Sequence, residues 1–251
     1  MVQREIRRTG AHINLETITV DFERGAYGEF KSIFGQHIDV NGCFFHLTQS
    51  TQRKAGDLGL KPYIMDNSER LDPDIRMFVA MIDAMAFVPI PDLQVALNAL
   101  NNNVPDPRVL LLLDYFVCTY VHGRPIPNTI PPRRSPPMFP PQIWNVYEVT
   151  LEGGDRTNNV CEGFNHGFNV LVGQRHPPFF AALEAIQKDH IVTKRNLLRS
   201  QRGIPLTQRV RQDVRNYNRN VTNLCVQYAN NVWQRDMLGY LRRISYNIRF
   251  R

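Results

Sequence analysis

The sequence ETITVDFERGAYGEFKSIFGQHIDVNGCFFHL, residues 16–47, contains the pattern that decides the fold. Apolar and polar residues alternate through Ile18 and Val20, which predicts a strand that ends before Asp21. The segment ERGAYGEFKSIFG then predicts a short helix, and IDVNGCFFHL at 38–47 predicts a second strand. A strand, a helix and a strand joined by short connections are typical of a βαβ unit, so we expect an α/β layer.

A block of helices is predicted to follow this unit. The segments TQSTQRKAGDLG, DIRMFVAMIDAMAFV, PDLQVALNALNN and DPRVLLLLDYFVCTYV have helical patterns, and the last three open with Asp or Pro at a cap position. The block ends in a proline-rich run, since 8 of the 17 prolines lie between residues 125 and 141. Such a run cannot form helix interior, so we expect an extended, polyproline-like connector that crosses the surface.

The C-terminal quarter carries the positive charge of the chain. Residues 191–251 hold 13 Lys and Arg against 2 Asp and Glu, whereas residues 1–190 are net negative. Arginine binds phosphate bidentately, so this tail predicts a non-specific DNA-binding segment. The arginines assigned to DNA are Arg209, Arg211, Arg215 and Arg219. An apolar stripe at spacings of three and four indicates that one side of the same helix is buried; it consists of Val210, Val214, Tyr217, Val221, Leu224, Tyr228 and Val232.

Composition excludes two broad classes. The most apolar stretch, VLLLLDYFVCTYV, is interrupted by Asp114 and is too short to span a bilayer. The four cysteines are widely spaced, which is not the pattern of a secreted disulfide scaffold. We therefore expect a nuclear or cytoplasmic protein that is not secreted and has no membrane partner.

The stretch GGDRTNNVCEGFNHGF, residues 153–168, places one glutamate, Glu162, among polar side chains. A helix that starts near Asn159 would put Glu162 in its first turn, facing a polar cleft. The structural alternative is a capping-box glutamate three residues after Asn159. Asp21 has a similar alternative as the N-cap of the helix that follows it.

Seven segments in order resemble the catalytic domain of a Mutator-like element (MULE) transposase. They are VDFERGAYGEF, GCFFHLTQSTQRK, AMAFVPIPDL, YFVCTYV, FPPQIWNVYE, DRTNNVCEGFNHGF and RHPPFFAALEAI, and the resemblance covers about residues 13–190. It implies a ribonuclease-H-like DDE enzyme, in which three carboxylates hold two divalent metal ions, Mg²⁺ or Mn²⁺, for DNA cleavage and strand transfer. It assigns Asp21 as the second catalytic acid and metal ligand and Glu162 as the third. The helical block then corresponds to the family's helical insertion.

The resemblance also predicts an incomplete fold. The three antiparallel strands that carry the family's first catalytic Asp do not fit before Asp21, so we expect two of the three carboxylates here and no activity from the chain alone. The expected fold class is α/β, with an incomplete ribonuclease-H-like core, a large all-α insertion and a helical basic C-terminal tail. The expected segments are 1–47 (partial core), 48–143 (insertion and connector), 144–190 (return to the core) and 191–251 (tail).

Three further residue sets have predicted roles with open alternatives. Cys43 and His46 fit the family's Cys-x-x-His element, and we favour a structural Cys43 and a hydrogen-bonding His46 near the cleft over a zinc site. Arg156 either contacts DNA or pins its loop. Trp144 either stacks on a flipped base or lies in the core.

Three function classes compete at this point. The first is a DDE transposase fragment, and the second is a non-catalytic DNA-binding or partner-binding protein derived from one. The third is a zinc or thiol hydrolase that uses Cys43 and His46, for which no third triad member can be named. The expected partner is DNA, with a homo-oligomer left open and no small-molecule substrate.

Overall fold

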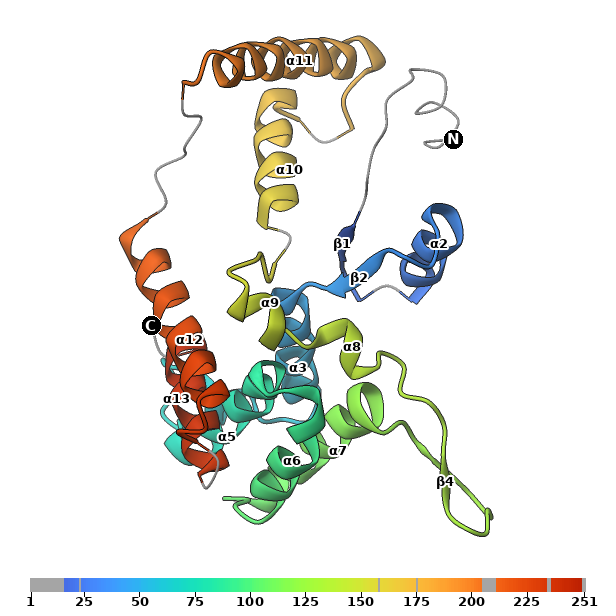
Figure 1. Cartoon of the computed structure of the whole chain (residues 1–251), viewed down its shortest axis with the longest axis vertical. Coiled ribbons are helices and arrows are strands. Elements are labelled where there is room, and N and C mark those ends of the chain that lie inside the picture. The colour runs from blue at the N-terminus through green and yellow to red at the C-terminus, as the bar shows by residue number, and fades with distance from the viewer. Residues whose placement is uncertain are drawn as a thin grey trace. The chain divides into compact units, whose positions relative to one another are not determined.

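The computed structural model describes residues 16–22, 24–157, 159–174, 176–204, 211–233 and 236–249. The chain forms two compact units, the first comprising residues 1–157 and 216–251 and the second residues 158–215 (Figure 1). These units divide the chain at other positions than the four segments expected from the sequence. Each unit is described by itself.

The described elements are mostly helices. In chain order they are β1 (Thr17–Val20), α2 (Arg24–Phe34), β2 (Asp39–Gly42), α3 (Phe44–Asp57), α4 (Lys61–Ile64), α5 (Pro73–Ala84), the 3₁₀ helices η1 (Met85–Phe87) and η2 (Ile90–Asp92), α6 (Leu93–Asn101), the 3₁₀ helix η3 (Pro107–Val109), α7 (Leu110–Phe116), the π-helix η4 (Val117–Val121), β3 (Pro125–Ile126), β4 (Arg133–Arg134), α8 (Pro141–Trp144), α9 (Tyr147–Leu151), α10 (Asn159–Val172), α11 (Phe179–Gln201), α12 (Gln212–Ala229) and α13 (Met237–Arg249).

The predicted βαβ unit is confirmed. Strands β1 and β2 pair in parallel, with Thr17 opposite Asp39 and Val20 opposite Gly42. The second strand is shorter than predicted, because the chain turns at Cys43 and α3 begins at Phe44. The prediction of a strand through residue 47 was therefore wrong: Leu47 is buried together with residues four and eight positions further along, which is the spacing of a helix face.

The α/β part is limited to this pair among the described residues, whose other sheet is the short hairpin β3–β4. The predicted incomplete ribonuclease-H-like core stays a prediction. Helices build the rest of the first unit, and the four helical segments predicted after residue 48 are all present. The carboxylate of Asp72 caps α5 by accepting hydrogen bonds from the backbone N–H groups of Asp74 and Ile75 at 3.0 and 3.1 Å.

The last two helices belong to the core of the first unit. In α12 Val221 and Cys225 are buried, and in α13 Tyr240, Leu241 and Ile244 are fully buried. Most of the predicted apolar stripe is thus confirmed as a packing face, since Tyr217, Leu224 and Tyr228 also pack against the core. Its predicted end is wrong, because Val232 is 63% exposed; Val210 lies outside the described residues.

A buried ion pair fastens α13 to α5. The carboxylate of Asp83 is fully buried and accepts a hydrogen bond from Arg249 Nε at 3.0 Å and a second from the same guanidinium. Arg249 also donates to the backbone carbonyl of Thr48 in α3 at 3.4 Å. Burial raises the pKa of Asp83, and the adjacent Arg249 guanidinium opposes that rise. One side chain near the end of the chain therefore ties three helices together.

The second unit consists of α10 and α11, and among its described residues only Ala185 is buried. Two small residues before it, Ala181 and Ala182, are partly buried. Large apolar side chains such as Phe179, at 74%, stay exposed.

Removing one partner of the buried ion pair should destabilise the first unit strongly. We expect Arg249→Met to lower the free energy of unfolding by about 3–5 kcal/mol, because it leaves the Asp83 carboxylate buried without its counter-charge. The double variant Asp83→Leu/Arg249→Met should recover most of that loss, since neither charge remains. Urea denaturation followed by circular dichroism measures both values, and a double variant as unstable as Arg249→Met would contradict the interpretation.

Candidate functional site

The carboxyl end of the parallel strand pair carries Asp21. This residue directly follows β1, and the backbone N–H of Cys43, which directly follows β2, donates to the carbonyl of Val20 at 2.8 Å. The carboxyl ends of parallel strands are where α/β proteins hold ligands. The Asp21 side chain is 46% exposed, so its oxygens are accessible to solvent. Helix α2 begins at Arg24, so Asp21 is not the residue that directly precedes it.

The neighbour of Asp21 fixes its position. The Phe22 ring packs edge-on against Phe139, with centroids 5.1 Å apart, and against Tyr120 at 5.8 Å. This ring lies directly over Gly42, where an added Cβ would come within 2.5 Å of the Phe22 ring. Only glycine leaves room for the ring, so a side chain at position 42 would push Phe22, and with it Asp21, out of place.

His46 lies against Asp21. It is in the first turn of α3, and its Nδ1 is 3.0 Å from Oδ1 of Asp21, within ion-pairing distance when the ring is protonated. The sequence had indicated a hydrogen-bonding histidine near the cleft, and the structure places it beside the predicted catalytic acid. The two residues meet because α3 starts immediately after β2, which a continued strand could not achieve.

Cys43 has a core position, as favoured from the sequence. Its side chain is fully buried at the residue that precedes α3. A buried thiol cannot meet a substrate, so the hydrolase alternative has no accessible nucleophile at this position. Cys225 is also buried, and burial raises the pKa of its thiol to about 11.

Arg156 pins the segment that leads to α10. Its backbone carbonyl accepts a hydrogen bond from the N–H of Phe44, at the start of α3, at 2.9 Å. Its guanidinium lies over the ring of Tyr217 at 4.9 Å and donates to the side chain of Asn218, both in α12. A cation over an aromatic ring contributes about 0.5–2 kcal/mol. Of the two roles open for Arg156, the structure supports the pinning role, because the charged group is already engaged with α12.

Glu162 lies in the first turn of α10, which begins at Asn159 as predicted. Its side chain is outside the described residues. Glu162 belongs to the second unit and Asp21 to the first, so their approach stays a prediction.

Trp144 is a core residue, which corrects its assignment to DNA. Its side chain is fully buried, and its indole N–H donates to the backbone carbonyl of Tyr120 at 2.7 Å. The Phe116 ring packs edge-on against it, with centroids 5.3 Å apart. A nucleic-acid base cannot reach this indole, because the proline-rich run leads back into the core at α8 instead of leaving Trp144 on the surface.

Three of the four assigned tail arginines are described, and all three are exposed. Arg211, Arg215 and Arg219 follow one another at spacings of four, so they lie along one side of the α12 segment. Arg211 is within 3.1 Å of Asp213, but both side chains are largely exposed, so this pair contributes little stability. Arg209 lies outside the described residues.

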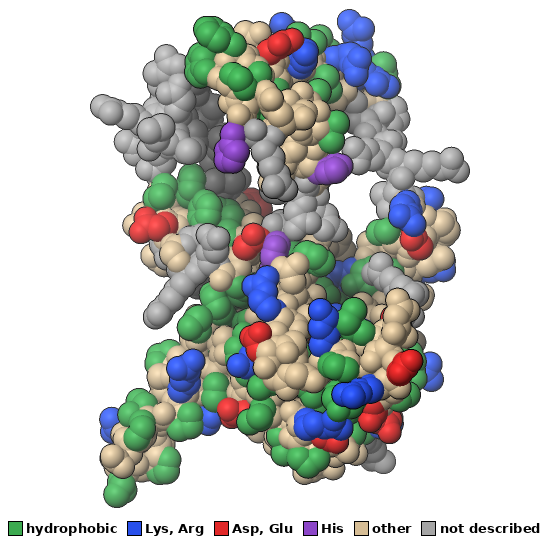
Figure 2. Space-filling model, turned by 180° about the vertical axis from the view of Figure 1, so that it is seen from behind, with side chains coloured by type: hydrophobic (Ala, Val, Ile, Leu, Met, Phe, Trp, Pro, Cys, Tyr) green, Lys and Arg blue, Asp and Glu red, His purple; other side chains and the backbone are tan. Residues whose placement is uncertain are grey.

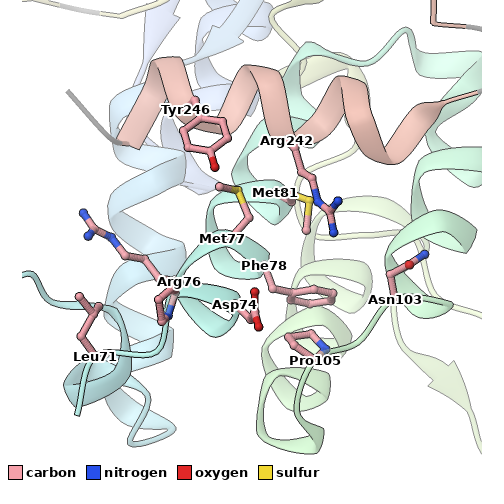
Figure 3. A pocket seen from close by; sticks show the side chains of 11 residues that line it. Leu71, Asp74, Arg76, Met77, Phe78, Met81, Asn103, Pro105, Arg242 and Tyr246 are labelled. Atoms are coloured by element: carbon pink, nitrogen blue, oxygen red, sulfur yellow. The ribbon is translucent and has the colours of Figure 1, made fainter.

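A pocket of about 680 Å³ was not predicted from the sequence. It lies between α5, the segment after α6, and α13, with Met77, Phe78 and Met81 on its apolar side and Arg242 and Tyr246 reaching over it from α13 (Figure 3). Neither Asp21 nor His46 lines it. The sequence gave little indication of this pocket, because its lining residues in α5 and in α13 are more than 160 positions apart along the chain.

Two features are absent from the described residues. No group of three or more His, Cys, Asp and Glu side chains is placed there to hold a metal ion. No helix in the described part of the chain has the length and apolar character needed to cross a membrane. A metal site at Asp21 stays a prediction.

Comparisons with known proteins give no relative: no family model, no curated protein and no solved structure matches this chain.

Truncating the Trp144 indole should test its structural role. We expect Trp144→Ala to lower the free energy of unfolding by about 3–5 kcal/mol through loss of core packing, and to leave the DNA affinity of the folded fraction unchanged. Trp144→Phe, which keeps an aromatic ring, should cost less. Thermal unfolding and fluorescence anisotropy with labelled duplex DNA measure the two effects. A stable Trp144→Ala variant with weakened DNA binding would restore the stacking role.

Proposed function

We propose that this chain is part of a MULE-type DDE transposase or a protein derived from one, and that it binds duplex DNA. In this proposal Asp21 and Glu162 are two of the carboxylate ligands for Mg²⁺ or Mn²⁺. The observation that carries the proposal is the position of Asp21 at the carboxyl end of a parallel βαβ pair, with His46 at 3.0 Å. This is the position that the transposase resemblance requires of its second acid.

The path of the chain towards Glu162 supports the same proposal. The carbonyl of Arg156 is bonded to the N–H of Phe44, two residues before His46. The segment that leads into α10 therefore leaves the first unit from the turn of α3 that also carries His46. Five residues lie between Arg156 and Glu162 in the sequence, so the proposal needs only a short connection between the anchored residue and the predicted acid.

The residues present fit one part of a metal site. Asp21 offers an accessible carboxylate on a rigid strand end, which is the kind of ligand that Mg²⁺ and Mn²⁺ prefer. When bound, a divalent ion of this kind polarises a phosphodiester and activates a water or a 3′-hydroxyl. His46 lies beside the Asp21 carboxylate, with Nδ1 3.0 Å from Oδ1, and the neighbouring Phe22 packs against Phe139 and Tyr120. The proposal assigns two of three carboxylates, so cleavage by this chain alone is not part of it.

DNA binding is assigned to the arginines of the tail. The side chains of Arg211, Arg215 and Arg219 are exposed, and α12 is anchored further along in the core of the first unit through Val221 and Cys225. A row of arginines on an immobilised helix contacts phosphates with little loss of backbone entropy. Such contacts position a protein on DNA without reading its sequence.

Neutralising the tail arginines should weaken DNA binding without unfolding the chain. We expect the fourfold change of Arg209, Arg211, Arg215 and Arg219 to Gln to lower the log–log salt slope of binding by about 3–4, since each phosphate contact releases about 0.9 counterion. Anisotropy titrations at several salt concentrations, without divalent metal, measure the slope.

The matched control removes four exposed cations elsewhere: Lys61, Arg53, Arg70 and Arg243. It changes the net charge equally and should leave the slope nearly unchanged. Deletion of residues 207–251 is not a usable test, because it removes the buried face of α13. Full salt-sensitive affinity in a folded fourfold variant would exclude the tail as the binding site.

The metal ligand can be tested with Mn²⁺ alone. We expect Asp21→Asn to weaken Mn²⁺ binding at least tenfold, because a carboxylate is replaced by a neutral amide, an energy of about 1.4 kcal/mol or more. Electron paramagnetic resonance of free Mn²⁺ gives the affinity. Asp39→Asn is the control, since Asp39 is exposed at the opposite end of the same strand pair. Equal effects of the two changes would remove Asp21 from the site.

A further inference from the structure

The proline-rich run forms a projecting arm instead of a featureless connector. We call residues 124–138 the arm. Strands β3 and β4 pair antiparallel within it, with Pro125 opposite Arg134 and Ile126 opposite Arg133. Figure 1 shows this hairpin extending away from the helices of the first unit. The run was expected to be an extended connector, and within it residues 125–126 and 133–134 pair as a short hairpin.

Hydrogen bonds hold the arm in one shape. At its base, Ser135 donates from its backbone N–H to the carbonyl of Arg124 at 2.8 Å and accepts from the N–H of Arg124 through its hydroxyl at 3.1 Å. Towards the tip, the hydroxyl of Thr129 donates to the carbonyl of Ile126 at 3.0 Å and accepts from the N–H of Arg133 at 2.9 Å. The arm is therefore ordered before any partner binds.

The base of the arm tolerates only glycine at position 123. Gly123 has a φ of +73°, and a Cβ there would lie 1.8 Å from the carbonyl oxygen of Ser135. The other side of the base is anchored by Phe139, which is buried and donates its N–H to the carbonyl of Thr119 at 3.1 Å. The arm is thus attached at both ends to the rigid core around η4.

An apolar residue stands at the end of this ordered arm. Ile130 is 98% exposed, and Ile126 and Met138 are 43% and 50% exposed. Figure 2 shows hydrophobic side chains gathered at the end of the arm and basic side chains along it. An isoleucine presented in this way by a preformed support gains apolar burial only when a partner covers it.

The charge of the arm identifies the class of partner. It holds three arginines, and the sequence has no Asp or Glu between Asp114 and Glu148. The side chains of Arg124 and Arg133 are exposed and form no ion pair with the described residues. An arm whose positive charge is not compensated is suited to binding a polyanion, because each arginine that contacts a phosphate releases counterions.

We propose that the arm binds duplex DNA in the minor groove, with Ile130 inserted as a wedge between base pairs and Arg124 and Arg133 on the flanking phosphates. Apolar side chains such as Ile and Pro act in this way on β-arms, where partial unstacking kinks the duplex. The arm extends the proposed DNA-binding function to a second surface, apart from the tail arginines. It adds an apolar wedge, which the tail arginines do not provide.

DNA bending by the full-length chain tests this proposal. A duplex of about 25 base pairs with a donor and an acceptor fluorophore at its ends should show increased energy transfer when the wild-type chain binds, because wedges kink DNA by about 20–90°. Ile130→Ser should abolish the increase and keep most of the affinity. Arg124→Gln/Arg133→Gln should lower the log–log salt slope by about 2.

Matched variants separate the arm from general surface effects. Val95→Ser replaces a β-branched residue that is 52% exposed on α6, and it should bend DNA like the wild type. Gly123→Ala should disturb the base of the arm and reduce bending while the helical circular dichroism stays normal.

Other results of the binding and bending experiments would overturn the arm proposal in distinguishable ways. Salt-sensitive binding without bending, or bending that Ile130→Ser leaves intact, would overturn the arm proposal and leave the tail proposal standing. No duplex binding by the wild type would overturn both. An Ile130→Ser variant that changes from dimer to monomer in analytical ultracentrifugation, with no effect on DNA, would assign the arm to a second copy of the chain and also overturn the proposal.

Discussion

The pairing of Asp83 with Arg249 is the interaction on which the first unit depends. A carboxylate without solvent contact is costly unless a positive group and hydrogen bonds compensate it. Arg249 provides both, and it also reaches the backbone of α3. Because Arg249 is in the last described helix and Asp83 in the middle of the helical block, the first unit closes only when the end of the chain has docked. The basic C-terminal segment is consequently a structural part of this unit as well as its most positive region.

The docking of the C-terminal helices determines which arginines stabilise the fold and which remain available for binding. Arg249 and Arg156 are used inside the protein, the first against Asp83 and the second against Tyr217 and Asn218. Arg211, Arg215 and Arg219 remain exposed, whereas Val221 and Cys225 further along α12 are buried in the core. Arginines therefore have different roles in this chain. The burial of the helix face around each arginine determines which role it has.

The candidate site shows the same dependence on tertiary support. No local motif marks Asp21 in the sequence. In the structure the ring of the neighbouring Phe22 is fixed over Gly42, and the early start of α3 brings Nδ1 of His46 to 3.0 Å from Oδ1 of Asp21. The base of the arm has a similar arrangement, in which the missing side chain of Gly123 permits a close approach to the carbonyl oxygen of Ser135. In both places glycine admits a close contact, next to an exposed side chain for which we propose a function.

The sequence by itself determined the elements whose signals are local. Alternating residues predicted β1, the helical spacing after residue 48 predicted α5 to α7, and the spacing of Val221, Leu224 and Tyr228 predicted a buried helix face. These signals are local because propensity and amphipathic period act within a few residues. The resemblance to the transposase family added proposed roles for Asp21 and Glu162, which no local pattern could have suggested.

Only the tertiary structure decided the contacts between distant segments. The sequence could not tell that Phe44 begins a helix, because an apolar run after a strand fits both a longer strand and a buried helix face until its neighbours are known. It left Trp144 and Arg156 with two roles each, since burial depends on what packs over a side chain. It likewise gave no sign that the proline-rich run would form an arm, because the hydrogen bonds between Arg124 and Ser135 join residues that meet only when the core fixes both ends of the run.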